Sequence, residues 1–527
     1  MIGDDAFYYL QIAFNWSRGL GSTFDGIRPT NGYQPLWEWA LAIFARGFAG
    51  KQSLLEGTQW LVVTLHVAMG WGIFATLGLR YSPALGLLAG FLWIIAQPIY
   101  RFTYGMESAI YAPMLLGLYL AWSRRTRLAV EDPVACHAWL GALAGLTVLA
   151  RFDALLLTLC LAGVLLVERA RGAVGTRSVL AFGLSLVLIL APYFVGNRMV
   201  FGTFWPVSVL IHSRGSSFAF EKLLHWSEQV FGRSGIPNLV VPDWTAGLVE
   251  GSGAGAALFH ALAIAGVTLG CACASARAGL RRDAAELVPR FPAALPFSAF
   301  LLGHWLIVAS GRAATWPQFW HFVPEFIAAA TVPAIGLGEV LRALARRREH
   351  AWARRAHGWI WGALAILGIR GGYLAARHWD GGPPPYVQNG WIEAAEWVNA
   401  NLPDSSVVGS WDSGYFGWAL KPAVMNLDGL VADYPYVRDV VLAGTDYVPT
   451  LIRLRVTHLL NEEVVGSSYP GTFHGVPLRY LAELREWPSV TEEDRRVVLF
   501  RFDPTGSQAV PSSRPTPREP ADSSPAP

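Results

Sequence analysis

Charged side chains are scarce in this sequence. Aspartate, glutamate, lysine and arginine make up 15% of the 527 residues, whereas a soluble chain usually carries about 25%. Hydrophobic residues reach 53%, and the mean hydropathy is +0.35. The net charge of +3 gives no reason to expect a nucleic-acid partner. This composition excludes an ordinary soluble domain and is typical of a protein that crosses a membrane several times.

Cysteine is also rare. A small secreted domain that depends on disulfides needs paired cysteines at suggestive spacings. The cysteines of this chain lie in or near apolar stretches, and none lies in the polar C-terminal part, so no disulfide framework is predicted there. Small buried hydrophobic residues are the simpler interpretation. The four cysteines are Cys136, Cys160, Cys271 and Cys273.

Long apolar runs divide the chain into membrane spans. Basic residues between the runs set the orientation, because lysine and arginine collect in cytoplasmic loops. Residues 138–167 are too long for one ordinary span and are interrupted by Arg151-Phe152-Asp153, so we expect two short helices with these residues at an external bend. The other expected spans cover residues 54–79, 83–98, 106–122, 178–196, 255–274, 291–309, 319–341 and 358–375.

These patterns predict a mainly α fold, a polytopic membrane helical bundle with a C-terminal extracytoplasmic α/β domain. The protein is expected in the plasma membrane, with both chain ends outside. Segments of helical or strand character in the α/β domain cover residues 391–401, 406–410, 424–427, 448–454, 458–460 and 497–502. The predicted domains are an external loop with interfacial helices at 1–50, a transmembrane domain of about ten spans at 51–378, the α/β domain at 379–503, and a disordered tail rich in proline and serine at 504–527.

The first external segment carries two adjacent carboxylates, Asp4 and Asp5, at the start of an amphipathic helical pattern. The pattern predicts an interfacial helix that holds both carboxylates close to the outer membrane surface. Helix capping is the competing explanation, because acids at a helix N-terminus interact well with the helix dipole. The apolar stripe contains Phe7, Leu10 and Phe14, and the opposite polar stripe contains Tyr8, Gln11, Asn15 and Arg18.

Short motifs follow one another along nearly the whole chain. They are Asp-Asp-Ala-Phe-Tyr-Tyr at residues 4–9, Asn-Gly-Tyr-Gln-Pro-Leu-Trp at 31–37, Gly-Met-Glu-Ser at 105–108, Ala-Arg-Phe-Asp at 150–153, Phe-Gly at 201–202, Pro-Val-Ser at 206–208, Trp-Asp-Ser-Gly at 411–414 and Asn-Leu-Asp-Gly-Leu at 426–430. In this order the motifs resemble those of bacterial GT-C-fold glycosyltransferases. This superfamily includes protein mannosyltransferases, aminoarabinose transferases of lipid A and mycobacterial arabinofuranosyltransferases.

The resemblance implies a membrane glycosyltransferase, either a hexosyl- or a pentosyltransferase. Its implied donor is a polyprenyl-phosphate sugar, and its acceptor is a glycan, a lipid or a protein on the outer face of the plasma membrane. A carboxylate of the first external loop is implied as the general base, so Asp4 and Asp5 are the predicted catalytic residues, with Asp4 favoured as the first acid of the motif. A divalent cation is the one cofactor that the resemblance leaves open.

The sequence departs from the family pattern in two ways. Members of the family have a membrane helix before the Asp-Asp loop, which predicts a further apolar helix upstream of Met1. Similar sequences often carry histidine where this chain has Gln34, so no acid–base role is assigned to that residue.

The leaving phosphate of such a reaction needs cationic or hydrogen-bonding groups. Arg151 is the foremost of these, because a charge so close to the bilayer interior is seldom idle, although a structural pair with Asp153 explains it as well. Glu107 begins an outward-facing helix end, where capping and a site role fit equally. His321 and Glu325 share a helix face, which is too little for a metal site, and no metal ligand is predicted. The predicted substrate-binding residues are Glu107, Arg151, Asp153, Arg28, Arg101 and His321.

Two other classes of function fit parts of the sequence. A lipid-linked sugar transporter or flippase accounts for the spans and for charges at membrane depth. It does not account for the asymmetric soluble domain or for the Asp pair, and the sequence has no visible inverted repeat. A catalytically inactive cell-envelope assembly protein is the other alternative. Transfer of label from a polyprenyl-phosphate sugar by the purified protein separates the first interpretation from both.

Overall fold

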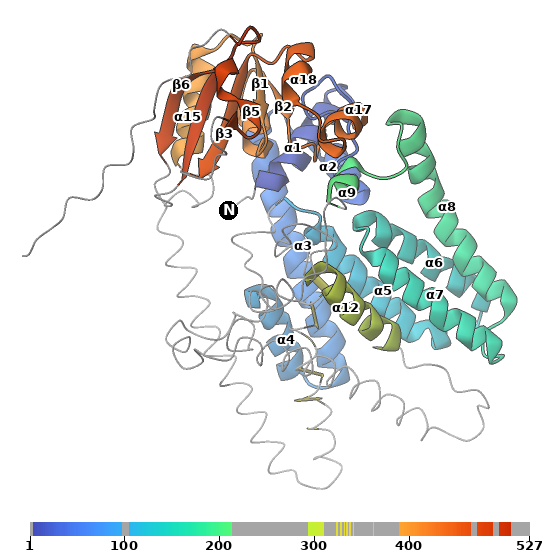
Figure 1. Ribbon diagram of the computed structural model, residues 1–527. Helices are drawn as coiled ribbons and strands as arrows, with labels where there is room; N and C mark the ends of the chain where they lie inside the picture. The colour runs from blue at the N-terminus through green and yellow to red at the C-terminus, as the bar shows by residue number, and fades with distance from the viewer. Residues whose placement is uncertain are drawn as a thin grey trace, which may run out of the picture. The chain divides into compact units, whose positions relative to one another are not determined.

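The chain forms two compact units (Figure 1). The first comprises Met1–Val387 together with Gly429–Val437, and the second comprises Gln388–Asp428 and Arg438–Pro527. The computed structural model describes residues 4–96, 105–212, 294–309, 389–464, 472–488 and 495–506, with single positions between 323 and 362. Helices dominate the first unit and a sheet organises the second, which confirms the predicted combination of a mainly α fold with a C-terminal α/β domain.

The described part of the first unit is helical. Among the described residues, three helices are long and apolar enough to cross a membrane, namely α3, α6 and α8, and α2 is a shorter apolar helix. The helices are α1 (Asp4–Ser17), α2 (Pro35–Ala45), α3 (Lys51–Arg80), α4 (Pro83–Ala96), α5 (Ser108–Leu128), α6 (Pro133–Ala150), α7 (Ala154–Ala170), α8 (Thr176–Val200), α9 (Val207–His212), α12 (Ala294–Ala309) and α17 (Tyr434–Tyr436).

The expected interruption of residues 138–167 is confirmed. α6 ends at Ala150, Arg151 follows in an extended conformation, and Asp153 is the residue before α7. Helices are also found at most of the other predicted apolar runs. These are the runs predicted to begin near residues 54, 83, 106, 178 and 291. The runs at 255–274 and 358–375, and most of 319–341, lie outside the described residues.

α6 and α8 approach each other closely because α6 carries small residues on the facing side. A Cβ atom on Gly141 would lie 2.1 Å from the Phe182 carbonyl oxygen, and one on Gly145 would lie 2.9 Å from Ile189 Cβ. Small residues at helix contacts are typical of membrane bundles, where close backbone approach supplies the packing energy. Around this contact the core of the bundle is filled by large side chains such as Trp93, Tyr111 and Trp122.

Three of the four residues of the polar stripe on the first helix, Tyr8, Gln11 and Asn15, are buried, and Arg18 is exposed. α1 forms, and Gln11 is 7% exposed and Asn15 is 5% exposed. Asn15 Nδ2 donates to the carbonyl oxygens of Thr23 and Phe24, at 2.9 and 3.0 Å. The loop after α1 folds back over this face and supplies the hydrogen-bond acceptors that water would otherwise offer.

The second unit is built on a sheet of five strands in the order β2-β1-β3-β7-β6. β1 is parallel to both β2 and β3, whereas β7 is antiparallel to β3 and β6. α15 packs against β6, with the Trp397 and Trp487 rings 6.0 Å apart. The elements are α15 (Asn389–Asn401), β1 (Val407–Ser410), α16 (Gly414–Ala419), β2 (Ala423–Asn426), a π-helical segment (Val437–Leu442), α18 (Tyr447–Arg453), β3 (His458–Val464), β4 (Thr472–Phe473), β5 (Val476–Pro477), a 3-10 turn (Leu478–Tyr480), β6 (Leu481–Pro488) and β7 (Arg495–Phe502).

Candidate active site

Glu107 stands immediately before α5 and is 3% exposed. Its Oε2 accepts a hydrogen bond from the Tyr9 hydroxyl at 3.0 Å, and its Oε1 pairs with Arg151 Nη1 at 2.9 Å. Both carboxylate oxygens are thus bound by side chains of other segments. A favourable interaction with the α5 dipole does not by itself account for these contacts.

Arg151 joins two carboxylates at the break between α6 and α7. In addition to its pair with Glu107, its Nε lies 2.8 Å from Asp153 Oδ2. The same Asp153 oxygen lies 3.1 Å from His304 Nε2 on α12. Both Arg151 and His304 are almost fully buried, at 5% and 2% exposure. We refer to Tyr9, Glu107, Arg151, Asp153 and His304 as the bend network.

The bend network keeps its charges because each is balanced. Burial disfavours ionisation of Asp153, but the Arg151 charge and the hydrogen bond with His304 outweigh it and hold the pKa of this carboxyl well below its ordinary value. Burial likewise disfavours the Arg151 charge, but Asp153 and Glu107 hold the pKa of the guanidinium above its ordinary value. The pKa of Tyr9 is raised by burial and then by the charge of Glu107, so its hydroxyl stays a hydrogen-bond donor.

Glycine and tryptophan bring α1 and α2 against the start of α5. Gly105 has a φ of 88°, and a Cβ atom there would lie 2.8 Å from Ala6 Cβ. Trp37 Nε1 donates to the Gly105 carbonyl oxygen at 2.8 Å. The loop between α1 and α2 also reaches the bend network, since the Gln34 backbone N–H donates to the Tyr9 hydroxyl oxygen at 3.2 Å and Gln34 Oε1 accepts from the Phe152 N–H at 3.3 Å. Gln34 therefore connects the first loop to the α6–α7 break.

Asn31 and Thr30, just before Gln34 in the same loop, are both buried and hold the loop in place. Asn31 Oδ1 accepts from the Val207 N–H at 3.2 Å, and Thr30 Oγ1 donates to the Ala432 carbonyl oxygen at 3.0 Å. Gly32 is required next to them, because a Cβ atom would lie 1.8 Å from the Leu430 carbonyl oxygen. Residues of the motifs at 31–37 and 206–208 thus meet Leu430 at one loop.

The predicted site residues fall into three groups. Glu107, Arg151 and Asp153 come together as described, and the predicted Arg151–Asp153 pair is present. Arg28 does not join them, because its Nε pairs with Asp25 Oδ2 in the loop at 2.6 Å. Arg101 and His321 lie outside the described residues. Asp4 and Asp5 form the first turn of α1 and are partly buried. Since side chains four apart share a helix face, Asp5 lies on the face of Tyr9, and Asp4 lies on that of Tyr8.

Four groups near the site had no clear signal in the sequence. Tyr9 belongs to the motif at residues 4–9 but had no assigned role, His304 is an isolated polar residue in an apolar run, and the partners of both are far away in the chain. His212 on α9 is partly buried, and burial together with the Arg151 charge lowers the pKa of its imidazole. Glu38 in the first turn of α2 is 0% exposed, and neither carboxylate oxygen has a hydrogen-bond partner among the described residues. Burial raises the pKa of Glu38 well above its ordinary value.

Among the described residues, no group of three or more histidine, cysteine, aspartate or glutamate side chains is arranged to hold a metal ion. In the bend network, both Glu107 oxygens bind protein groups and one Asp153 oxygen is shared by Arg151 and His304. The other Asp153 oxygen, Oδ1, has no hydrogen-bond partner among the described residues.

No protein-family model matches the sequence, and no curated protein matches it. Among solved structures, the chain is similar to the oligosaccharyltransferase of Archaeoglobus fulgidus in the apo form, with a TM-score of 0.52 and 16% identity over 92% of this chain and 69% of that one. For the complex of that enzyme with zinc and sulfate, the TM-score is 0.50 and the identity 15%, over 87% of this chain and 64% of that one. The chain thus spans about two thirds of the length of that enzyme.

ArnT from Cupriavidus metallidurans in the apo state matches over more of its own length. The TM-score is 0.50 and the identity 13%, over 96% of this chain and 94% of that one. At such identities the likeness is one of fold.

Proposed function

We propose, from the GT-C fold that the chain has in common with these enzymes, that it is a membrane glycosyltransferase using a polyprenyl-phosphate sugar as donor. One observation carries the proposal beyond fold. The motif residues Glu107, Arg151 and Asp153, which are far apart in the sequence, form one buried network with Tyr9 of α1. α1 begins with the Asp pair, so the carboxylates and the buried charges belong to one region of the first unit.

The proposed reaction is a displacement at the anomeric carbon of the donor sugar. The acceptor hydroxyl oxygen forms a bond to that carbon, and the bond from the carbon to the phosphate oxygen breaks. The phosphate oxygen leaves with the bonding electron pair, so the polyprenyl phosphate departs as an anion. The hydroxyl proton passes to an aspartate carboxylate acting as general base.

Asp4 and Asp5 are the proposed bases, and helical geometry now favours Asp5. Asp5 and Tyr9 are neighbours on one helix face, and Tyr9 binds Glu107 at 3.0 Å. Asp4 shares its face with Tyr8, whose ring packs on Phe24 in the loop at 5.5 Å. The Asp5 face therefore leads to the bend network and the Asp4 face leads away from it.

Arg151 is proposed to supply positive charge for the leaving phosphate. Its two carboxylate partners fix the orientation of the guanidinium and prevent it from rotating away. The two carboxylates also compensate the positive charge of Arg151. Arg151 would therefore act on the leaving phosphate through the fixed direction of its N–H groups more than through its net charge. Glu107 and Asp153 are accordingly positioning residues in this proposal. His212, whose pKa is lowered by burial and then by the Arg151 charge, would contribute as a neutral hydrogen-bonding side chain.

The outer face is the proposed location of the site. The opposite ends of the same helices carry the basic residues Arg124, Arg125, Arg169 and Arg177, and such residues collect on the cytoplasmic side. Single cysteines at the exposed positions Ile27 and Val130, in a variant without the native cysteines, test this with a membrane-impermeant maleimide. Labelling of position 27 in intact cells supports the outer location, and labelling of position 130 contradicts it.

Activity is tested directly by incubating the purified protein with a panel of radiolabelled polyprenyl-phosphate sugars and a cell-envelope extract as acceptor. We expect label to move from one donor class, hexosyl or pentosyl, to a glycan, lipid or protein fraction. Repeating the reaction with EDTA and with added Mg²⁺ or Mn²⁺ tests a divalent cation. No transfer from any donor, together with movement of the intact lipid across vesicles, would instead support a flippase. If the protein shows neither sugar transfer nor lipid movement, the result would favour a cell-envelope assembly protein.

A further inference from the structure

A second polar site lies at the opposite end of the helices that carry the bend network. α5 and α7 end there, and α6 and α8 begin there. α6 has 18 residues, so the two ends are about 27 Å apart. That distance is close to the thickness of the hydrocarbon core of a bilayer, about 30 Å. The two sites would therefore lie near opposite surfaces of the membrane.

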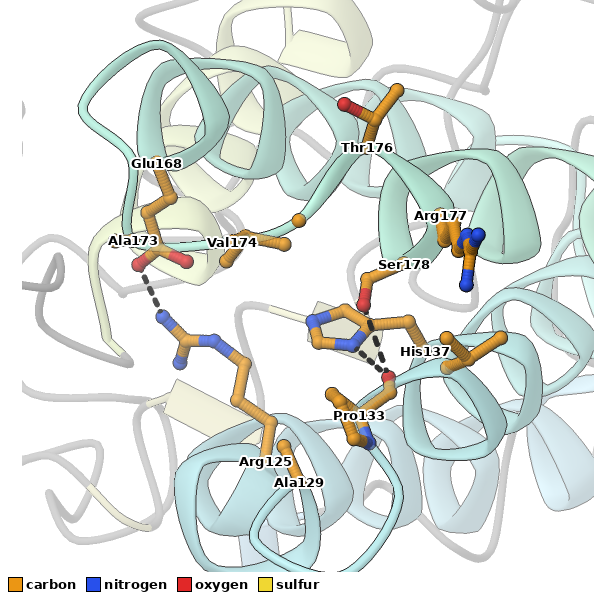
Figure 2. Close-up of a pocket in the computed structure, with 12 residues that line it drawn as sticks. Arg125, Ala129, Pro133, His137, Glu168, Ala173, Val174, Thr176, Arg177 and Ser178 are labelled. Carbon is orange, nitrogen blue, oxygen red and sulfur yellow. Dashed lines mark hydrogen bonds and ion pairs between the residues drawn. The ribbon is translucent and has the colours of Figure 1, made fainter.

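The second site is a pocket of about 650 Å³. Figure 2 shows Arg125 and Glu168 on one side of it and His137 and Ser178 on the other. Arg125 is 4% exposed, its Nη2 lies 2.7 Å from Glu168 Oε1, and its guanidinium lies 4.2 Å from the centre of the Trp122 ring. We call this cavity the inner pocket.

The lining of the inner pocket favours an anion. The Glu168 charge is compensated by Arg125, and Arg177 adds an exposed positive charge. The Pro133 carbonyl oxygen, which would repel an anion, accepts hydrogen bonds from His137 Nδ1 at 2.6 Å and Ser178 Oγ at 3.3 Å. α8 begins beside it after Gly175, which gives no side-chain cap. The N–H groups of Thr176 and Arg177 and the positive end of the helix dipole are therefore available to an anionic group, whereas the Ser178 N–H donates to the Gly175 carbonyl oxygen at 3.1 Å.

An apolar surface continues from the inner pocket along α8. Leu180, Leu184 and Leu188 are 65%, 62% and 63% exposed. Side chains four residues apart lie in one row along a helix, and this row begins one turn after the pocket residue Arg177. A ligand with a phosphate at the pocket and a hydrocarbon chain along the row would match both surfaces, whereas a free phosphate would use only the first.

We propose that the inner pocket binds the phosphate group of an anionic phospholipid in the cytoplasmic leaflet, with one acyl chain along the α8 leucine row. Basic pockets between membrane helices on the cytoplasmic side are suited to such headgroups. The exposed Arg124 and Arg169 nearby would draw anionic lipids to this end of the bundle. The proposal does not depend on the proposed transferase activity.

The test uses the purified full chain in neutral detergent. Dioleoylphosphatidylglycerol is titrated while retained lipid is counted by native mass spectrometry, with dioleoylphosphatidylcholine and inorganic phosphate titrated in parallel. The variants are Arg177→Gln and Thr176→Glu. Position 176 is exposed, and an acid there suits the helix dipole, so folding should be kept. Arg171→Gln is the matched control, since it removes an equal charge from an exposed position outside the pocket lining.

We expect phosphatidylglycerol to bind more tightly than the other two ligands. Arg177→Gln should weaken its binding by about five-fold, the effect of one basic residue beside an anionic surface, and Thr176→Glu by at least as much, with Arg171→Gln unchanged. Three results would overturn the proposal. They are equal binding of phosphatidylcholine, equal loss in Arg171→Gln (which would mean diffuse surface charge), and inorganic phosphate binding as tightly as the lipid.

Discussion

The two ends of helices α5–α8 each bury an arginine against a carboxylate, but the surroundings of the two pairs differ. Arg125 has a pair with Glu168 beside an open pocket. Arg151 has two carboxylates, and these in turn bind His304 and Tyr9. The Arg151 end is a closed network that includes residues of α1 and α12. The Arg125 end is a cavity with exposed arginines around it.

The comparison teaches that a buried ion pair is by itself weak evidence for function. The Coulombic gain of such a pair is largely offset by the loss of hydration, whereas removing one partner leaves a costly uncompensated charge. What distinguishes the Arg151 end is convergence, since residues from α1, α12, the α6–α7 break and the position just before α5 share one set of hydrogen bonds and ion pairs. What distinguishes the Arg125 end is access, because a ligand can enter between the helix ends.

The largest expected effect is on turnover at the Arg151 end. Asn retains the size of Asp and much of its capping ability but cannot accept the proton. Loss of a general base lowers the rate by about 10²–10⁴-fold, so we expect Asp5→Asn to fold and bind donor normally but to transfer sugar this much more slowly. Initial rates of label transfer measure it, with Asp4→Asn alongside and Arg171→Gln as the control at the other end. Full activity in both Asn variants would show that the base lies elsewhere, and would direct attention to Glu107 or Asp153.

The next effect is on stability and compares the two arginines directly. Removing one partner of a buried pair costs about 3–5 kcal/mol. We expect Arg151→Met to destabilise more than Arg125→Met, because it leaves two buried carboxylates uncompensated and the latter leaves one. Chemical denaturation in detergent gives the free energies of unfolding. The double variant Arg125→Met/Glu168→Leu should recover most of the loss, and a greater cost for Arg125→Met would refute the proposed difference between the ends.

The third expected effect is a pH dependence of the stability that the Asp153 carboxylate contributes. Its pKa is held below the ordinary value in the folded protein, so the unfolded chain binds the proton first as the pH falls. The Asp153 carboxylate thus stabilises the fold above about pH 4, the unfolded pKa, and this contribution is lost as the pH falls towards the folded pKa. Asp153→Asn should lower the melting temperature at pH 7, and the gap to the unmodified protein should narrow below pH ~4. A gap that is constant over this range would argue against the charge as the cause.

The smallest effect concerns Glu38, whose pKa shift has the opposite sign. Its pKa is raised by burial, so its stabilising neutral form is fully present below about pH 4.3 and is lost as the pH rises towards the folded pKa. The unmodified protein should therefore lose melting temperature between pH 5 and pH 8, and Glu38→Gln should lose less. Melting curves at the two pH values measure this, and equal slopes would mean that Glu38 is not buried as a neutral acid.

Much of this arrangement could be predicted from the sequence where the signal is local. The break at Arg151-Phe152-Asp153 was predictable, because a run too long for one span was interrupted by charges. Strands β1, β2 and β7 were expected close to their observed bounds. β6 was missed, because its middle residues are exposed and include charged side chains, as edge strands often do.

Long-range contacts could not be predicted in this way. His304 lies in an apolar run whose pattern predicts only a membrane helix. Its partner Asp153 is 151 positions away in the chain. The polar stripe of α1 was expected to face outward because its spacing is amphipathic. It is buried because the following loop provides carbonyl acceptors for Asn15, and the spacing of the helix itself carries no information about that loop.

The central claim is that the donor binds at the Arg151 end of the bundle and not at the inner pocket. A polyprenyl-phosphate sugar with a photoreactive group close to the phosphate, crosslinked to the purified protein and mapped by peptide mass spectrometry, tests it most directly. We expect crosslinks within residues 4–37, 105–111 or 151–153, and an excess of unlabelled donor should suppress these crosslinks. Crosslinks confined to residues 125–137 and 168–178, suppressed in the same way, would contradict it.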